Sequence, residues 1–104
     1  MNNLSGIIYC GICGKRYNFK LNANTPLYIC QTKKNYGKVR CNSQTINESF
    51  LLGIIETHLN HLNKLYTPTK VKLFVREIRI DDIDITIFYK DGSISKSNST
   101  EIIF

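Results

Sequence analysis

The sequence YCGICGK, from Tyr9 to Lys15, places two cysteines three positions apart on a turn that contains two glycines. Such a pair can supply adjacent corners of the tetrahedron of ligands around a zinc ion. The other two cysteines of the chain follow after sixteen and then ten intervening residues. The spacing predicts one structural Zn²⁺ per chain, with the four thiolate ligands Cys10, Cys13, Cys30 and Cys41.

Three other uses of these cysteines have to be weighed against zinc. A pair of disulfides would need an oxidising compartment, whereas residues 1–9 lack the basic start and the apolar run of a signal peptide. A rubredoxin-like iron site would use two knuckles, and the sequence shows one clear knuckle. A redox-active Cys-x-x-Cys motif would need a thioredoxin-like strand-then-helix context, which is missing. The pattern therefore favours zinc in a reducing compartment.

Positive charge is concentrated in the part of the chain that holds the cysteines. Residues 1–45 include seven Lys and Arg and no Asp or Glu, whereas residues 73–104 include four basic and six acidic side chains. A basic surface of this kind favours a polyanionic partner, most commonly nucleic acid. The alternative is a solvated lysine-rich surface that only maintains solubility. No apolar stretch approaches the roughly 18 residues of a membrane span, so we expect no membrane partner.

The segment between Cys30 and Cys41 is predicted to be a loop that contacts phosphate groups. It carries four basic side chains, and a metal bound to both flanking cysteines would hold its ends in place. Tyr36 in this loop either stacks on a sugar or base or only supports the loop. Three more basic residues lie close to the first cysteine pair. The candidate nucleic-acid-binding residues are Lys15, Arg16, Lys20, Lys33, Lys34, Tyr36, Lys38 and Arg40.

Residues 1–46 are predicted to form a zinc ribbon, followed by one long helix. Three short β-prone runs, at residues 7–9, 16–20 and 27–30, are expected to build one small antiparallel sheet. The helix covers residues 47–66 and begins either at a capping box from Thr45 to Glu48 or at Asn47. It should end before Pro68. Its apolar stripe consists of Leu52, Ile55, Leu59, Leu62 and Tyr66, widened by Phe50, Leu51 and Ile54.

Residues 70–104 are predicted to form antiparallel strands that pack with the ribbon and the helix. One strand covers residues 70–80, with Phe74, Ile78 and Ile80 on one side, and a second covers residues 84–90. In the second strand Ile85, Ile87 and Tyr89 face one way together with Ile83. Asp91 and Gly92 indicate a tight hairpin into a third strand. The predicted class is α+β: a zinc β-ribbon, one long helix and a C-terminal antiparallel hairpin or meander, in one compact domain.

No group of residues in the sequence suggests a catalytic site. His58 and His61 lie three positions apart on the predicted helix, but four cysteines already complete a zinc site. No Ser/His/Asp or Cys/His arrangement stands out, and no acid pair is placed with a plausible base. We therefore expect a binding domain rather than an enzyme.

The residues around the cysteines resemble the zinc β-ribbon of large serine recombinases, the phage integrases and transposon recombinases. The similar stretches are LSGIIYCGICGK from Leu4, YIC from Tyr28, CNS from Cys41 and INESFL from Ile46. Residues 74–80 and 85–92 are also similar to the strand pair that closes the C-terminal domain of that family. The similarity covers nearly the whole chain.

The resemblance implies a non-catalytic domain that binds double-stranded DNA at attachment sites, because in this family the serine nucleophile belongs to a separate resolvase domain. It also implies a cytoplasmic, nucleoid-associated protein of a bacterium or phage. Many members carry a coiled-coil insertion that links recombinase molecules, and residues 65–69 leave no room for it. The alternative function is a protein-interaction module for other recombinase subunits or for a directionality factor.

Overall fold

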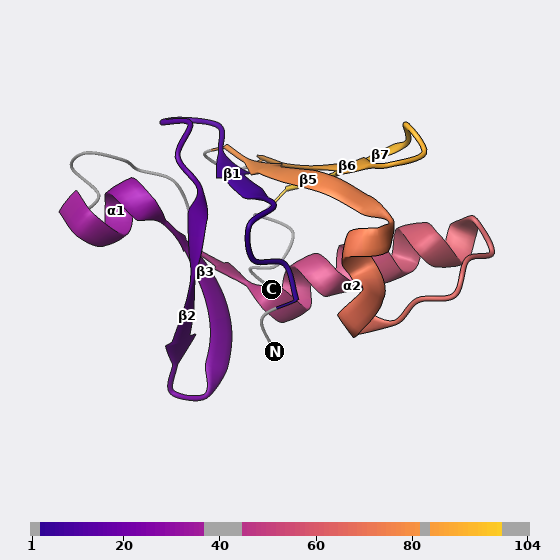
Figure 1. Ribbon diagram of the computed structural model, residues 1–104, viewed down its shortest axis with the longest axis horizontal. Helices are drawn as coiled ribbons and strands as arrows, with labels where there is room; N and C mark the ends of the chain where they lie inside the picture. Colours follow the sequence, from indigo (N-terminus) through magenta and orange to yellow (C-terminus); the bar gives the residue numbers. More distant parts are fainter. Residues whose placement is uncertain (1–2, 37–44, 82–83, 99–104) are drawn as a thin grey trace.

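The computed structural model describes residues 3–36, 45–81 and 84–98, and it shows the predicted α+β class (Figure 1). Two sheets and one main helix make up these residues. In chain order the elements are β1 (Ile8–Cys10), β2 (Tyr17–Asn22), β3 (Thr25–Cys30), α1 (Gln31–Tyr36), β4 (Ile46–Asn47), α2 (Glu48–His61), the 3₁₀ helix η1 (Pro68–Leu73), β5 (Val75–Ile80), β6 (Asp84–Tyr89) and β7 (Ile94–Asn98).

The first sheet is a hairpin of β2 and β3 to which the short strand β4 adds. Its strands are antiparallel, and their register runs from Tyr17 opposite Cys30 to Asn22 opposite Thr25. The two residues of the connecting loop, Ala23 and Asn24, both have positive φ angles, 49° and 68°, as a type I′ hairpin turn requires. This pairing confirms the strands predicted near residues 16–20 and 27–30, and it carries Cys30 to the open end of the hairpin.

The prediction that β1 joins this ribbon sheet is wrong. β1 instead lies parallel to β5, with Ile8 opposite Ile78, at one edge of a second sheet in the order β1-β5-β6-β7. Its pairing with β2 is limited to an isolated bridge between Tyr9 and Arg16. The reason is burial: Ile8 and Ile78 are each no more than 1% exposed, so β1 covers apolar surface that the ribbon hairpin does not offer. The cysteine turn after β1 is therefore attached to the C-terminal sheet.

Helix α2 packs along one face of the second sheet, below it in Figure 1. Its fully buried apolar side chains are Leu51, Ile55 and Leu59, which recur every four residues. The predicted stripe is thus only partly correct, because Leu62 is 41% exposed. The buried face of α2 therefore begins at Leu51, one residue before the start of the predicted stripe at Leu52.

The helix also ends earlier than predicted, at His61 instead of near Tyr66. The cause is a Schellman motif: Asn63 adopts a left-handed conformation with φ 56°, and the N–H of Lys64 donates to the carbonyl of Leu59 at 2.9 Å. The N–H of Asn63 donates to the carbonyl of Asn60 at 3.1 Å. These bonds satisfy the last carbonyl groups of α2 before the chain reaches Pro68.

The start of α2 lies at the predicted position, with Asn47 as the N-cap residue. The Asn47 side chain makes no capping hydrogen bond. Glu48, the first residue of α2, is buried. Its Oε2 accepts hydrogen bonds from the Tyr28 hydroxyl at 2.7 Å and from the N–H of Asn3 at 2.9 Å. These tertiary hydrogen bonds connect the first turn of α2 to β3 and to the N-terminal residues.

The C-terminal sheet differs from its prediction at its first strand. Residues Pro68–Leu73 form η1, so β5 begins only at Val75. An irregularity in the pairing with β6, between Val75 and Glu77, shifts the alternation so that Val75 rather than Phe74 is buried beside Ile78 and Ile80. In β6 the predicted inward residues Ile85, Ile87 and Tyr89 are buried, whereas Ile83 lies outside the described residues.

The predicted hairpin at Asp91 and Gly92 is confirmed, because β6 and β7 pair antiparallel on either side of it. The N–H of Tyr89 donates to the carbonyl of Ser93 at 3.0 Å and closes the turn. Asp82 and residues 99–104 lie outside the described residues. Among the helices that are described, none is long and apolar enough to cross a membrane.

Candidate metal centre

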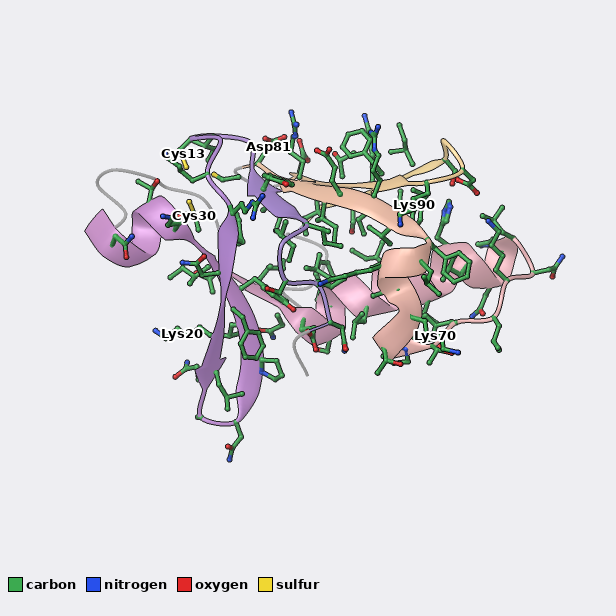
Figure 2. All side chains as sticks on the ribbon, viewed as in Figure 1. Cys13, Lys20, Cys30, Lys70, Asp81 and Lys90 are labelled. Atoms are coloured by element: carbon green, nitrogen blue, oxygen red, sulfur yellow. The ribbon has the colours of Figure 1, made fainter. Side chains whose placement is uncertain are left out.

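Three cysteine thiols meet at the open end of the β2–β3 hairpin. Cys10 ends β1, Cys13 lies in the turn that follows, and Cys30 ends β3. Their Sγ atoms all lie within 4.8 Å of one another, and those of Cys13 and Cys30 are 3.4 Å apart. Ligands at about 2.3 Å in a tetrahedron around zinc are about 3.8 Å from each other. The three sulfurs therefore fit three corners of a thiolate metal site (Figure 2 labels Cys13 and Cys30).

Hydrogen bonds within the turn hold the first two thiols in place. The N–H of Cys10 donates to the carbonyl of Lys15 at 2.8 Å, and the N–H of Gly14 donates to the carbonyl of Cys10 at 3.0 Å. The N–H groups of Ile12 and Cys13 point at the Cys10 sulfur, at 3.4 and 3.5 Å. Gly14 has a φ angle of 78°, which side chains other than glycine rarely adopt. The glycine-containing sequence thus folds the backbone around the Cys10 sulfur.

The C-terminal sheet supports the same turn from the other side. The N–H of Gly11 donates to the carbonyl of Ile80 at 2.8 Å. The Asp81 carboxylate lies so close to Gly11 that a Cβ atom at that position would overlap it. Sequence reasoning identified neither the role of Gly11 as a close-contact position nor that of Asp81, because residue 81 is seventy positions away in the chain.

The environment of Cys13 favours its thiolate form. Burial by itself raises the pKa of Cys13, but hydrogen bonds outweigh it and lower the pKa from 9.0 to about 6. The Thr32 hydroxyl, 3.4 Å from the Cys13 sulfur, contributes most to this lowering, followed by the backbone of Lys15 and the thiols of Cys30 and Cys10. A thiol that loses its proton near neutral pH is suited to bind a divalent metal. Thr32 was also missed from the sequence, since a hydroxyl two residues after a cysteine carries no distinctive signal.

No disulfide joins any two of the three cysteines that the structure describes. The Cys13–Cys30 sulfur separation of 3.4 Å is well beyond the roughly 2.05 Å of an S–S bond. Of the predicted ligands, Cys10, Cys13 and Cys30 come together, whereas Cys41 lies outside the described residues. A fourth thiolate from Cys41 remains a prediction.

The two histidines of α2 lie away from this cluster. The His58 ring stacks on Tyr89, with ring centroids 3.9 Å apart, and its Nε2 lies 2.9 Å from the Ser93 hydroxyl. His61 is exposed at the end of the helix. The structure therefore assigns His58 a packing contact with the β6–β7 hairpin.

The predicted nucleic-acid-binding residues are placed in part. Lys15, Arg16 and Lys20 are exposed, and the Arg16 guanidinium lies over the Tyr9 ring. Residues 31–36 form the helix α1 and not the predicted loop. Lys33, Lys34 and Tyr36 belong to this helix, but their side chains are not described, and Lys38 and Arg40 lie outside the described residues. Figure 2 shows Lys20 and α1 at the same end of the long axis of the molecule.

Comparison with known protein families gives a match that includes the cysteine cluster. Residues 4–60 match the family described as recombinase zinc beta ribbon domain. The matched region includes the three clustered cysteines, Cys41 and nearly all of α2, and it ends before η1 and the strands β5 to β7. No curated protein and no solved structure shows a significant match.

Proposed function

The chain belongs to the family of recombinase zinc beta ribbon domains, and from this we propose that it is a non-catalytic module that binds double-stranded DNA at the attachment sites of a site-specific serine recombinase. The observation that carries the proposal is the match of residues 4–60 together with the convergence of three thiols inside that region. A binding role is favoured over an enzymatic one because the matched domain is not the catalytic part of a recombinase.

The metal in this proposal is one zinc ion held by Cys10, Cys13, Cys30 and Cys41. Three of these thiols already stand at distances that suit a tetrahedral thiolate site. Zinc would supply a rigid crosslink between the turn after β1 and the start of α1, since Cys30 directly precedes that helix. The basic residues on either side of the site would then be held in fixed relative positions.

The DNA-contacting surface in this proposal combines Lys15, Arg16 and Lys20 with the basic residues of the segment 31–40. Lys15, Arg16 and Lys20 are exposed, and none of them forms an ion pair with another residue of the described part of the chain. Unpaired lysines and arginines can neutralise phosphates and release counterions, which makes binding salt-dependent and largely independent of sequence. Base recognition would require one arginine, Arg16 or Arg40, to reach a guanine edge.

The test is a salt titration of binding to duplex DNA. We expect that replacing Lys33, Lys34 and Lys38 by Ala together weakens binding and reduces the slope of log K against log salt by about 3, since each phosphate contact contributes about 0.9. The matched control replaces Lys70, Lys72 and Lys90 by Ala. These three lysines are exposed, and Figure 2 shows Lys70 and Lys90 far from α1 along the long axis.

Two results would contradict this proposal at different levels. A wild-type, zinc-loaded protein that binds no duplex at low salt would exclude the DNA-binding role. If the wild type binds and both triple variants lose the same amount, the effect reflects only total charge and segment 31–40 is not the contact surface.

A second candidate function, a protein-interaction module, is favoured by one group of exposed apolar side chains. Leu62 and Leu65, in the connection between α2 and η1, and Leu73, at the end of η1, are 41%, 84% and 64% exposed. Two other apolar residues, Leu59 and Phe88, contribute less to such a surface because Leu59 is buried and Phe88 is half-buried. The partner would be another recombinase subunit or a directionality factor. Self-association that disappears in a Leu65→Asp variant, measured by sedimentation, would support this candidate.

A further inference from the structure

One face of the sheet β1-β5-β6-β7 is covered and the other is not. Helix α2 lies along one side of this sheet in Figure 1. Ile78, Ile85 and Ile87 are fully buried, which assigns them to the covered side. Across the opposite side, no element of the described chain lies over the sheet in Figure 1. We refer to the side opposite α2 as the outer sheet face.

Strand register aligns basic residues from separate parts of the chain across the outer sheet face. Tyr9 pairs with Arg79, Arg79 with Thr86 and Thr86 with Lys96, and Arg16 pairs with Tyr9 through the isolated bridge. Residues that pair across neighbouring strands point to the same face. Because neighbouring strands are about 4.8 Å apart, the row places Arg79 about 10 Å from Arg16 on one side and about 10 Å from Lys96 on the other. A regular line of positive charge thus crosses the sheet.

Aromatic rings on the same face position two arginines. The Arg16 guanidinium carbon lies 5.8 Å from the centroid of Tyr9, and that of Arg76 lies 5.4 Å from the centroid of Phe88. The irregularity between Val75 and Glu77 turns Arg76 outward, where it is exposed beside Phe88. A guanidinium on a ring keeps its edge N–H groups available for phosphate oxygens, and it loses less conformational freedom on binding.

Acidic residues on this face leave most of the positive charge available. Glu77 accepts one hydrogen bond from Arg79, at 3.3 Å between Oε2 and Nη2. A guanidinium has five N–H donors, so this single bond leaves the others of Arg79 available. Asp81 and Asp84 lie at the end of the strands near the cysteine turn. Arg16, Arg76 and Lys96 form no ion pair with any other described residue.

The outer sheet face is also continuous with the metal centre. A hollow of about 270 Å³ lies where the two meet, and it is lined by Tyr9, Glu77 and Arg79 together with Cys10, Gly11 and Gly14 of the cysteine turn. Arg16 belongs to both surfaces, because it follows the turn and also stands over Tyr9. A polyanion bound beside the cysteine turn could therefore extend directly onto the outer sheet face.

From these observations we infer that the outer sheet face is a second DNA-contacting surface, on which Arg16, Arg76, Arg79 and Lys96 bind the sugar-phosphate backbone of a duplex. The inference rests on the proposed function and extends it beyond the matched residues 4–60 to β5 and β7. A polyanion is favoured over an apolar protein partner because the row contains three exposed basic groups, of which Arg16 and Lys96 form no ion pair with another described residue. These contacts are to phosphates, so they do not depend on knowing the target sequence.

The experiment uses the whole zinc-loaded chain and a mixed-sequence DNA duplex of about two helical turns. Arg76→Gln and Lys96→Gln are combined, which leaves the Glu77–Arg79 pair intact. We expect the slope of log K against log salt to fall by about 2 and the affinity at about 0.1 M salt to fall roughly tenfold or more. Zinc content and thermal midpoint are expected to stay at the wild-type values, because both side chains are exposed.

The matched control combines Lys70→Gln and Lys72→Gln, which removes the same charge from η1 on the side of the sheet where α2 lies. We expect this variant to bind nearly as tightly as the wild type. Equal binding by the two double variants, with a wild type that binds, would overturn the role of the outer sheet face and leave the proposed function standing. A wild type without DNA binding would instead overturn the proposed function and this inference with it.

Discussion

Glu48 joins three segments that lie far apart in the sequence. Its buried carboxylate accepts hydrogen bonds from the Tyr28 hydroxyl of β3 and from the N–H of Asn3, and the Tyr28 oxygen accepts a further one from the N–H of Leu4 at 3.0 Å. Burial, followed by the hydrogen bond to Glu48, raises the pKa of Tyr28, so this hydroxyl stays protonated and donates throughout the physiological range. The network attaches the N-terminal residues to the ribbon and to α2.

Removing this carboxylate should destabilise the fold. We expect Glu48→Ala to lower the free energy of unfolding by about 2–3 kcal/mol, because the buried Tyr28 hydroxyl would be left without its acceptor. Urea unfolding of the zinc-loaded protein measures the change. Glu56→Ala provides the control, since Glu56 is exposed on the same helix and should change stability by less than about 0.5 kcal/mol. Equal effects of the two substitutions would contradict the importance of the network.

A single residue in α2 offers a change of opposite sign. Gly53 is exposed in the middle of the helix, and a Cβ added there would meet no atom within 4 Å. Alanine has the higher helix propensity, so we expect Gly53→Ala to raise the free energy of unfolding by about 0.5–1 kcal/mol. The same urea titration measures it. A decrease in the free energy of unfolding would contradict this prediction, because it would mean that the added methyl group meets another part of the protein.

At the scale of secondary structure elements, β1 has two roles. It is a strand of the C-terminal sheet, where Cys10 pairs with Ile80, and it also delivers the first thiol to the metal centre. The family match ends at residue 60, so it includes β1 but not its partner β5. A ribbon limited to the matched residues would expose the apolar side of β1, including the fully buried Ile8.

We therefore expect a fragment of residues 1–60 to fold poorly even with zinc. Without β5, Ile8 and Cys10 lose the partners Ile78 and Ile80, and the Gly11 N–H loses its acceptor. The comparison is between the two-dimensional NMR spectra and zinc affinities of the fragment and the whole chain. A well-dispersed spectrum and an unchanged zinc affinity for the fragment would show that the ribbon folds independently of the C-terminal sheet.

At the scale of the whole molecule, the candidate metal centre lies where the two sheets meet. Cys10 is the last residue of β1, the edge strand of the C-terminal sheet, and Cys13 lies in the turn after it. Cys30 is the last residue of β3, the central strand of the ribbon sheet. Backbone pairing between the sheets is limited, since the bridge from Tyr9 to Arg16 is isolated from any named ladder. A bound ion would accordingly provide a strong link between them.

Chelation of the metal should unfold the ribbon. Apparent zinc-binding free energies of about 10–16 kcal/mol in comparable modules exceed the net stability of about 5–15 kcal/mol typical of a domain. We expect one zinc per chain by elemental analysis and a large loss of circular dichroism and of thermal midpoint after treatment with a chelator, reversed by added zinc. A protein purified without chelator that contains no zinc and melts at the same temperature would refute the site.

Features that depend on residues close together in the sequence could be predicted from it. The Cys-x-x-Cys turn with its glycines, the hairpin at Asp91 and Gly92, the alternation of Ile85, Ile87 and Tyr89 and the existence of a helix after residue 47 each follow from local spacing or turn chemistry. The sequence also indicated three sulfurs that the structure brings together. Local patterns suffice here because backbone geometry relates neighbouring residues in a fixed way.

Only the tertiary structure decided features that depend on contacts across the chain. It paired β1 with β5 and not with the ribbon, and it buried Glu48 against the Tyr28 hydroxyl. The irregularity after Val75 determined which residues of β5 are buried. It also aligned Arg16, Arg79 and Lys96 in one row. The physical reason is that burial and strand register depend on contacts between segments that are far apart in the sequence. A local stretch of sequence does not contain the information about which distant segment it will contact.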